Sequence, residues 1–475
     1  MSIETFDGAA FEFTVPVLVA GGGACGLTAA LAAAEAGAQV LVLERDPVPL
    51  GTTAMSSGLI PAAGTRAQRA AGITDDSPER FADDLVDKVG NALDRERALH
   101  VCAQSTVTVD WLIDVHHLPL TLFEAAGSLP GHSRSRLHGT PNRTGEELMA
   151  SLQDAVIAAG GDIMTDARVS ALIVDDVRRV RGVKVDRPDG SVERIGCDTL
   201  ILATCGYAAS ERLIARHIPE IQAAVTHTHP ASRGDALAWG EAMGAATGDL
   251  TGYQGHGNLA AGHGLLVSWL SITEGGFQVN AGGERFSDEG LGYSEQATHV
   301  AAQPDAFAWT IYDQRVHAVM TPIAEYRDVV AAGALRHADD IADLAEQIRV
   351  PEDILAREFA LIDAAIESGE PDRFGRRFIP TRRLAPPFVA VKVNGALFHT
   401  QGGLEVDHDA RVMATDGTTF PNLFAGGGAA RGLSGPTAAG YVAGNGLMTA
   451  TTLGRLAGQA AAQQVLSLHN GSRPA

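Results

Sequence analysis

The chain has 475 residues, a formal net charge of -21 and four cysteines that form no C-x-x-C pair. This length is enough for two or three domains with sizeable cores. The negative charge argues against a nucleic-acid or anionic-membrane partner, and the cysteine pattern argues against a metal cluster or an attached haem. With no basic and apolar leader and no run of about 18 apolar residues, we expect a cytoplasmic protein without a membrane span.

A complete dinucleotide fingerprint lies near the start of the chain. The apolar run 15–20 predicts a buried strand that leads directly into a Gly-x-Gly-x-x-Gly turn made by Gly21, Gly23 and Gly26. An alanine-rich helix is predicted over 27–36, and a second strand follows it. The order of strand, glycine turn, helix and strand is typical of a Rossmann-type nucleotide site. A glycine-rich turn without a ligand is the alternative, which the complete unit disfavours.

Each part of this unit has a physical role at a pyrophosphate. Gly21 allows the tight turn, Gly23 lets the backbone approach the phosphates, and Gly26 lets the helix pack close to the sheet. The free N–H groups and partial positive charge of the helix N-terminus attract the phosphates. The second strand, over 39–43, ends at Glu44, whose carboxylate can accept hydrogen bonds from ribose hydroxyls. We therefore predict a bound dinucleotide.

Helix and strand signals alternate after this unit. Ser77 and Thr144 are typical N-terminal cap residues and predict two helices. The apolar segments 163–174, 180–185 and 199–204 predict strands. Such alternation is typical of an α/β fold.

The two ends of the chain resemble each other more than they resemble the middle. From about residue 244 glycine and histidine become frequent, and the last stretch returns to a strand, a glycine-rich turn and a helix. The last stretch is too short for a core of its own. We predict one dinucleotide domain of the α/β class built from 1–243 and 386–475. An α+β capping domain that holds the substrate, 244–385, is inserted into it.

Several sequence blocks together resemble the flavoprotein family of soluble fumarate reductases, urocanate reductases and 3-ketosteroid 1-dehydrogenases. They follow the family's order over almost the whole chain. The blocks are Val17-Leu18-Val19-Ala20-Gly21-Gly22-Gly23, Gly51-Thr52-Thr53-Ala54-Met55-Ser56-Ser57-Gly58, Leu202-Ala203-Thr204-Cys205-Gly206, Gly283-Glu284-Arg285-Phe286-Ser287-Asp288-Glu289, His399-Thr400-Gln401-Gly402-Gly403-Leu404 and Gly444-Asn445-Gly446-Leu447. The resemblance implies FAD, a Rossmann-like FAD-binding domain and a cap that closes over the flavin. It also implies hydride exchange between the flavin and a carbon close to an activating carbonyl.

The fingerprint and the resemblance together give the expected cofactor-binding residues. No histidine stands in the Gly51–Gly58 block, where membrane-bound relatives attach FAD, so the resemblance implies a non-covalent flavin. A glycine at 427 puts in doubt a side-chain contact that relatives make from this position. The expected residues are Gly21, Gly23, Ala24, Gly26, Glu44, Arg45, Thr52, Thr53, Ser57, Gly58, Val169, Ala203, Thr204, Gly206, Asp235, Gly427, Asn445, Gly446 and Leu447.

The resemblance also places four candidate catalytic residues. Tyr293 follows the Arg285–Glu289 block, where fumarate reductases have a proton-donating arginine and ketosteroid dehydrogenases a tyrosine, so it is the acid/base candidate. His399 matches a histidine that contacts the substrate carbonyl or carboxylate. Tyr441 falls where fumarate reductases clamp a carboxylate with arginine, and a phenol there suits a ketone better. Arg431 is a candidate cation. For each of them a purely structural role is the alternative.

These residues favour an FAD-dependent dehydrogenase that introduces an α,β double bond beside a ketone, in a ring or a cyclic keto acid. One alternative is a reductase of an α,β-unsaturated carboxylate, and another is a flavin-binding module without turnover. The partner is a small-molecule substrate. The sequence leaves the electron acceptor open among oxygen, a quinone and a redox protein, and it leaves open the substrate, the direction and the oligomeric state.

Overall fold

The computed structural model of the chain describes residues 2–123 and 131–471. Within these ranges nine strands form the larger of its sheets. The parallel centre of this sheet has the order β7 (Asp162–Met164), β3 (Val40–Leu43), β2 (Phe13–Ala20), β10 (Val192–Leu202) and β21 (Thr419–Ala425). Strands β9 (Val180–Asp186), β8 (Arg168–Val174) and β1 (Ser2–Thr5) continue it beyond β10, and β20 (Arg411–Met413) pairs with β21. Both chain ends thus contribute to one sheet, as predicted.

Strand β10 joins the early and late parts of the chain. Its first half pairs antiparallel with β9 and its second half pairs parallel with β21. On its other edge it pairs with β2 along nearly its whole length. The last four residues of β2 are fully buried, which is the burial expected for a central strand of a parallel sheet.

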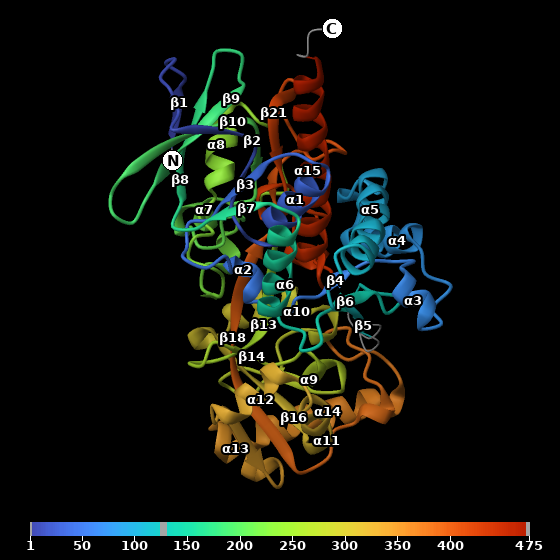
Figure 1. The fold of residues 1–475 in the computed structure, drawn as a ribbon. Coiled ribbons are helices and arrows are strands. Elements are labelled where there is room, and N and C mark those ends of the chain that lie inside the picture. The colour runs from blue at the N-terminus through green and yellow to red at the C-terminus, as the bar shows by residue number, and fades with distance from the viewer. Residues whose placement is uncertain (1, 124–130, 472–475) are drawn as a thin grey trace.

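Helices α1 (Ala24–Glu35) and α15 (Asn445–Gly471) pack side by side on one face of this sheet (Figure 1). Small residues permit the close approach. A Cβ atom at Gly458 would lie 2.1 Å from the carbonyl oxygen of Ala29, and one at Gly454 would lie 2.4 Å from that of Cys25. The alanine and glycine content of these two segments therefore holds the last helix against the first.

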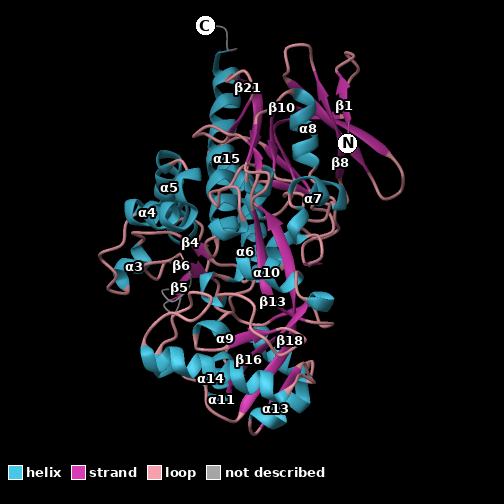
Figure 2. Ribbon diagram, turned by 180° about the vertical axis from the view of Figure 1, so that it is seen from behind, coloured by secondary structure: helices cyan, strands magenta, loops and turns pink. Residues whose placement is uncertain are grey.

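A second sheet lies at the other end of the molecule (Figures 1 and 2). Its described strands have the order β14 (Leu265–Leu266), β13 (Tyr253–Ala260), β18 (Phe388–Thr400), β16 (Phe307–Asp313) and β15 (Phe277–Val279), with β11 (Val225–Thr226) and β17 (Leu335–Ala338) also on β18. The 13-residue strand β18 runs from this sheet towards the larger one. Because β11 precedes 244 and β18 follows 385, the sheet takes strands from both sides of the expected domain boundaries, which stay a prediction.

Helices of the middle segment pack around the second sheet. They are α9 (Leu270–Thr273), α10 (Tyr293–Ala301), α11 (Gln314–Met320), α12 (Ala324–Ala331), α13 (Ile341–Ile348) and α14 (Glu352–Ser368). Two apolar clusters hold this layer together, one centred on Phe277 and Phe359 and the other on Tyr312 and Val391. The combination of this sheet and its helices matches the α+β cap expected from the sequence.

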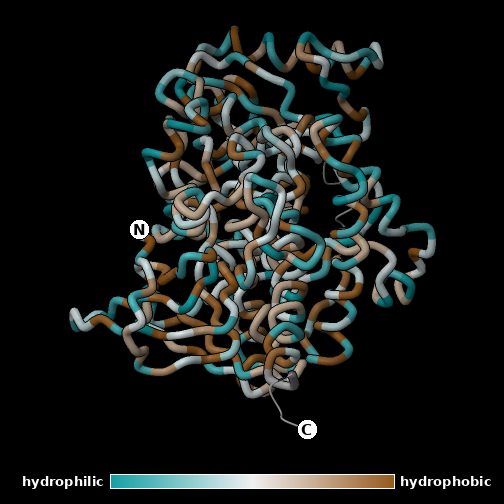
Figure 3. The backbone as a smooth tube through the Cα atoms, turned by 90° about the horizontal axis from the view of Figure 1, so that it is seen from above, coloured by the Kyte–Doolittle hydropathy of each residue, from teal (hydrophilic) through white to brown (hydrophobic). Residues whose placement is uncertain are grey.

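The remaining elements complete the larger layer. Helices α3 (Arg66–Ala70), α4 (Pro78–Val89) and α5 (Arg95–Asp114) lie to one side of it (Figure 1). The others are α2 (Gly51–Ala54), α6 (Gly145–Ala158), α7 (Glu211–His217), α8 (Asp235–Met243), and the short strands β4 (Ile60–Pro61), β5 (Thr121–Phe123), β6 (Leu137–Gly139), β12 (Thr247–Gly248) and β19 (Gly403–Leu404). Hydrophobic and hydrophilic segments alternate along the coloured parts of the trace (Figure 3).

Two local predictions were tested by these elements. Ser77 and Thr144 do cap α4 and α6, because each hydroxyl accepts a hydrogen bond from a backbone N–H of the first turn. The single strand predicted over 163–174 was wrong, since it is divided into β7 and β8. Asp166 between them has a left-handed φ of 53°, and the N–H of Ala167 donates to the carbonyl of Glu44.

No helix within residues 2–123 and 131–471 combines the length and apolar character needed to cross a bilayer. Over the same ranges no group of three or more His, Cys, Asp or Glu side chains is arranged to hold a metal ion.

Candidate active site

A cavity of about 490 Å³ lies where the carboxyl ends of the parallel strands meet β13, β18 and α10 of the second layer. Parallel α/β sheets bind ligands at this edge, because the loops that follow adjacent strands open there. One end of the cavity is lined by the glycine turn and the residues that follow β3 and β10. The other end is lined by Tyr293, His399 and Tyr441.

The glycine turn is closely packed against the next strand. Gly21 has φ of +105°, and a Cβ there would lie 2.4 Å from the carbonyl oxygen of Ala203. A Cβ at Gly26 would lie 1.9 Å from the carbonyl oxygen of Gly21. These two positions therefore require glycine. Gly23 immediately precedes α1 and offers no side-chain cap, so the helix N-terminus faces the cavity with backbone groups.

Glu44 is held in a fixed orientation at the end of β3. Its side chain is buried, and its two carboxylate oxygens accept hydrogen bonds from the N–H groups of Gly22 (2.8 Å) and Asp46 (2.9 Å). Burial raises the pKa of Glu44, and these two hydrogen bonds oppose that rise. Each oxygen keeps a further lone pair for a ligand hydroxyl.

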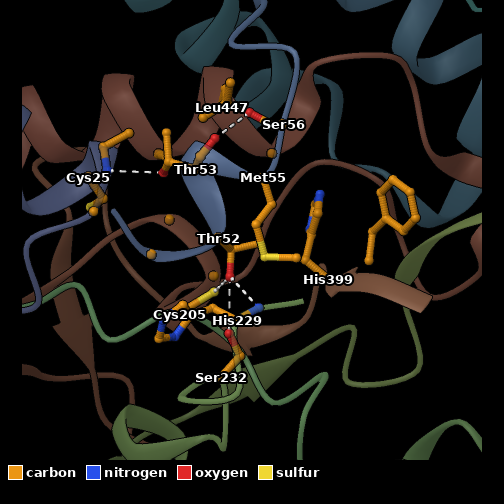
Figure 4. A pocket seen from close by; sticks show the side chains of 18 of the residues that line it. Cys25, Thr52, Thr53, Met55, Ser56, Cys205, His229, Ser232, His399 and Leu447 are labelled. Atoms are coloured by element: carbon orange, nitrogen blue, oxygen red, sulfur yellow. Dashed lines mark hydrogen bonds between the residues drawn. The ribbon is translucent and has the colours of Figure 1, made fainter. Parts of the chain in front are cut away.

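A polar cluster surrounds Thr52 on the cavity wall (Figure 4). Its hydroxyl lies 3.2 Å from Ser232 Oγ and 3.7 Å from Cys205 Sγ, and it accepts a hydrogen bond from the N–H of His229 (3.4 Å). The neighbouring Thr53 hydroxyl accepts from the first N–H of α1 at 3.2 Å. The second sequence block is thus fastened directly to the fingerprint helix.

Most of the predicted cofactor residues line this cavity. They are Gly21, Gly23, Ala24, Glu44, Arg45, Thr52, Thr53, Ser57, Gly58, Val169, Ala203, Thr204, Asp235, Gly427, Gly446 and Leu447. Gly26, Gly206 and Asn445 do not line it. Among the described residues, the buried Thr204 Oγ1 and Asn445 Oδ1 have no hydrogen-bond partner. A glycine cradle with an ordered acid and unpartnered polar atoms fits a large nucleotide cofactor.

Tyr293 is the first residue of α10 and faces the opposite end of the cavity. Its ring stacks on His256 with centroids 4.7 Å apart, and it meets Trp269 and Tyr441 edge to face, each at 6.0 Å. Burial, with smaller contributions from Tyr441 and Glu295, holds the pKa of Tyr293 well above the usual value of a phenol. The hydroxyl is therefore protonated at neutral pH.

Tyr441 stands just before the last helix and is almost fully buried. Burial raises the pKa of Tyr441, while the nearby backbone N–H groups of Gly446 and Gly444 oppose that rise. A phenol in its protonated form has one hydrogen to donate. Tyr441 can consequently donate a hydrogen bond into the cavity.

His399, at the end of β18, is fixed by a chain of hydrogen bonds. The Ser434 hydroxyl lies 2.9 Å from Gln401 Oε1, and the Gln401 side-chain amide lies 2.9 Å from His399 Nδ1. Nδ1 also lies 3.4 Å from the carbonyl of Thr400, but the 2.9 Å contact with the amide is shorter. With the amide oxygen accepting from Ser434, the amide nitrogen donates to Nδ1, and we assign the ring hydrogen to Nε2. Burial lowers the pKa of His399 to about 4, so the ring is neutral at pH 7.

Arg431 does not line the cavity, and the expectation that it supplies a cation to the substrate needs correction. Its guanidinium donates to Asp249 and to Glu405, both at 2.7 Å. These partners lie far from Arg431 in the sequence, and the two ion pairs fix its side chain among them. We therefore leave Arg431 out of the site.

Two further side chains lie at the cavity. His256 from β13 stacks on Tyr293, and Glu325 from α12 reaches the cavity and accepts a hydrogen bond from Ser57 (3.1 Å). Gln401 belongs to the sequence block His399–Leu404, but nothing in the sequence indicated a function for its side chain. Only its position inside the His399 block could have indicated it, and no local pattern marks Glu325.

The fold and the site define a dinucleotide-binding flavoenzyme of the two-layer, capped type. A family described as "FAD binding domain" matches residues 16–447, and the chain belongs to this family. It binds FAD and is an oxidoreductase that acts on CH–CH groups.

Relatives and solved structures agree with this assignment. The chain is 28% identical to a fumarate reductase (cytochrome) of Shewanella frigidimarina, over 95% of this chain and 77% of the relative. It is 27% identical to a 4-oxocyclohexanecarboxylate 2-dehydrogenase of Sinomonas cyclohexanicum, over 97% and 95%. The structure of an open flavocytochrome c3 fumarate reductase superposes with a TM-score of 0.82 at 27% identity, covering 97% of this chain and 80% of the other. A 3-ketosteroid-Δ4-(5α)-dehydrogenase from Rhodococcus jostii RHA1 has the same fold, with a TM-score of 0.76 at 22% identity and coverage of 97% and 99%.

Proposed function

We propose that the protein is an FAD-dependent dehydrogenase that introduces an α,β double bond beside a ketone, in a cyclic ketone or a cyclic keto acid. The observation that carries the proposal is the convergence of Tyr293, Tyr441 and His399 at one end of the cavity. All three can exchange or donate a hydrogen bond with a carbonyl compound, and none carries a positive charge at pH 7.

The cofactor belongs at the other end of the cavity. We infer that the glycine turn and the N-terminus of α1 hold the pyrophosphate, and that Glu44 holds a ribose. The N-terminus of α15, at Asn445 and Gly446, lies beside His399, since a Cβ at Gly446 would be 2.6 Å from the His399 ring. FAD, when bound, supplies the acceptor for a hydride from the β-carbon of the substrate.

Tyr441, His399 and Tyr293 have different roles in polarising the ketone and in transferring the proton. Tyr441 and the Nε2–H of His399 are the donors that polarise the ketone oxygen and stabilise enolate-like charge. Tyr293 acts as the base in its phenolate form, which is the minor form at pH 7, and it becomes the neutral phenol when it takes up the proton that leaves the α-carbon. The α-carbon loses a proton and the β-carbon loses a hydride, so the bond between them becomes double. The rings of His256 and Trp269 around Tyr293 keep water from the reacting carbons.

The second candidate is a reductase of an α,β-unsaturated carboxylate, because several relatives are named as fumarate reductases. Against it, tyrosine stands at 293 and 441, where the family resemblance implies arginine for a dicarboxylate. The relatives reported above are named as reductases or dehydrogenases, which counts against a module without turnover.

Product analysis tests the proposal. The FAD-loaded enzyme is incubated with cyclohexanone derivatives and an artificial electron acceptor, and the mixture is assayed for the conjugated enone by ultraviolet absorbance and by a mass lower by two hydrogens. Formation of an enone supports the proposal. Absence of an enone from every ketone, with reduction of an unsaturated carboxylate by the chemically reduced enzyme, favours the second candidate.

A further inference from the structure

Glu325 places a carboxylate on the wall of the cavity. It lies on α12, and its Oε1 accepts the hydrogen bond from Ser57 of the larger layer. Among the described residues no cation forms an ion pair with it. Burial raises the pKa of Glu325, opposed by the Ser57 bond. Whether ionised or protonated, the group offers no positive charge to a ligand.

The positively charged side chains on the cavity wall lie next to the cofactor residues. In the described part of the chain, the arginines on this wall are Arg45 and Arg168, which stand next to the cofactor residues Glu44 and Val169. Arg431 is bound to its two acidic partners. The segment 124–130, which lies outside the described residues, contains no lysine or arginine in its sequence.

The histidines at the substrate end do not replace these cations. Burial lowers the pKa of His256 to about 3 and that of His399 to about 4. Burial also lowers the pKa of His227. All three rings are therefore neutral at pH 7. A substrate carboxylate in this end would lose water without gaining an ion pair, which is costly.

The remaining wall combines apolar side chains with the polar Gln254 and Asp328. The apolar ones include Leu59, Leu137, Leu265, Leu266 and Phe398. Such a surface stabilises hydrocarbon by removing it from water. The tyrosines and His399 then provide hydrogen bonds for a single carbonyl.

We propose that the substrate is a neutral ring ketone and that Glu325 makes the site reject carboxylates. This inference rests on the proposed function and narrows it, because it removes keto acids from the candidate substrates. Glu325 acts on selectivity and takes no part in proton or hydride transfer.

Three matched ketones test the selectivity. They are 4-methylcyclohexanone, methyl 4-oxocyclohexanecarboxylate and 4-oxocyclohexanecarboxylate, each mixed anaerobically with the oxidised holoenzyme while flavin bleaching is followed. We expect the two neutral ketones to bleach the flavin and the acid to do so at least about tenfold more slowly. In Glu325→Gln the acid-to-ester rate ratio rises, and in Glu325→Lys it rises further. Glu346→Gln, an exposed change on α13, is the matched control and leaves the ratio unchanged.

A binding measurement separates this inference from turnover. Phenols imitate a ring enol without reacting, so 4-methylphenol and 4-hydroxybenzoate are titrated and their dissociation constants read from the flavin difference spectrum. We expect the neutral phenol to bind at least about tenfold more tightly. Equal binding of the two phenols, or equal bleaching by the acid and its ester, overturns the inference while the proposed function stands. Bleaching by none of the ketones overturns the proposed function, and the phenols then report on charge selection alone. A parent enzyme that discriminates and a Glu325→Gln variant with the same ratio contradict the role of Glu325.

Discussion

The rings of Tyr293 and Tyr441 meet edge to face, with centroids 6.0 Å apart and planes inclined by 64°. Tyr293 begins α10 beside the second sheet, whereas Tyr441 precedes α15 of the larger layer. The contact therefore brings one phenol from each layer to the same end of the cavity. In the proposed mechanism a substrate held there would meet hydroxyl groups from both layers, and the reaction would require the two layers to be packed together.

Removing the Tyr293 hydroxyl tests its role as acid and base. Tyr293→Phe keeps the ring that packs on His256 and loses only the hydroxyl, which is the proposed acid/base group. We expect FAD content and fold to be retained, and turnover to fall by about 10²–10⁴-fold. Tyr312→Phe is the control, because that buried hydroxyl bonds Tyr326 (2.8 Å) away from the cavity. Near-normal turnover in Tyr293→Phe would remove this residue from the mechanism.

Substitution of Glu44 tests the cofactor end of the cavity. Glu44→Ala loses the acceptor for the N–H groups of Gly22 and Asp46 together with the proposed ribose contact. We expect FAD affinity to weaken by about 1–3 kcal/mol, which is about 5- to 150-fold in Kd. The measurement is a titration of the apoprotein followed by flavin fluorescence. Asp154→Ala, an exposed change on α6, should leave Kd as it is; an equal loss in both variants would assign the effect to stability.

The mode of FAD attachment can be read after denaturation. The Gly51–Gly58 block contains no histidine, so we expect acid precipitation or heat to leave FAD in the supernatant and a colourless pellet. The absorbance and mass of the released flavin identify it. Flavin that stays with the precipitated chain would show a covalent bond and contradict this prediction.

The protein should become less stable towards unfolding in acid, because some of its histidines are buried and uncharged in the folded state. His138 has both ring nitrogens engaged, near Thr65 Oγ1 (2.9 Å) and the carbonyl of Ile60 (3.3 Å), and burial lowers its pKa from 6.5 to about 4. As pH falls below 6.5 the unfolded chain binds a proton that the folded chain does not, so stability decreases until about pH 4. For this residue the loss is about 2 kcal/mol at pH 5.

Thermal unfolding at saturating FAD measures this effect. His138→Gln should lower the midpoint at pH 7, because two hydrogen bonds are altered, and should reduce the further fall between pH 7 and pH 5. His263→Gln changes an exposed histidine and serves as the control. An identical fall in the parent protein and in His138→Gln would show that His138 does not carry this dependence.

Local signals predicted the cofactor end better than the substrate end. The turn at Gly21, the acid at Glu44 and the return of the chain end to the same sheet follow from short patterns and from burial. The position of the Arg431 guanidinium depends on its ion pairs with Asp249 and Glu405, which lie far away in the chain. Such pairs cannot be predicted from the spacing of residues in the sequence. The tautomer of His399 likewise depends on a chain through Gln401 to Ser434 that only the folded molecule assembles. The break between β7 and β8 was missed because Asp166 adopts a left-handed backbone conformation inside an otherwise strand-like pattern.

The central claim is that the two tyrosines adapt this site to a ketone and to desaturation. The most direct measurement is anaerobic stopped-flow absorbance in both directions on the same holoenzyme. We predict that a saturated cyclic ketone such as 4-methylcyclohexanone bleaches the oxidised flavin, and that fumarate does not reoxidise the chemically reduced enzyme at a useful rate. Rapid reoxidation by fumarate, with no bleaching by any cyclic ketone, would contradict the account.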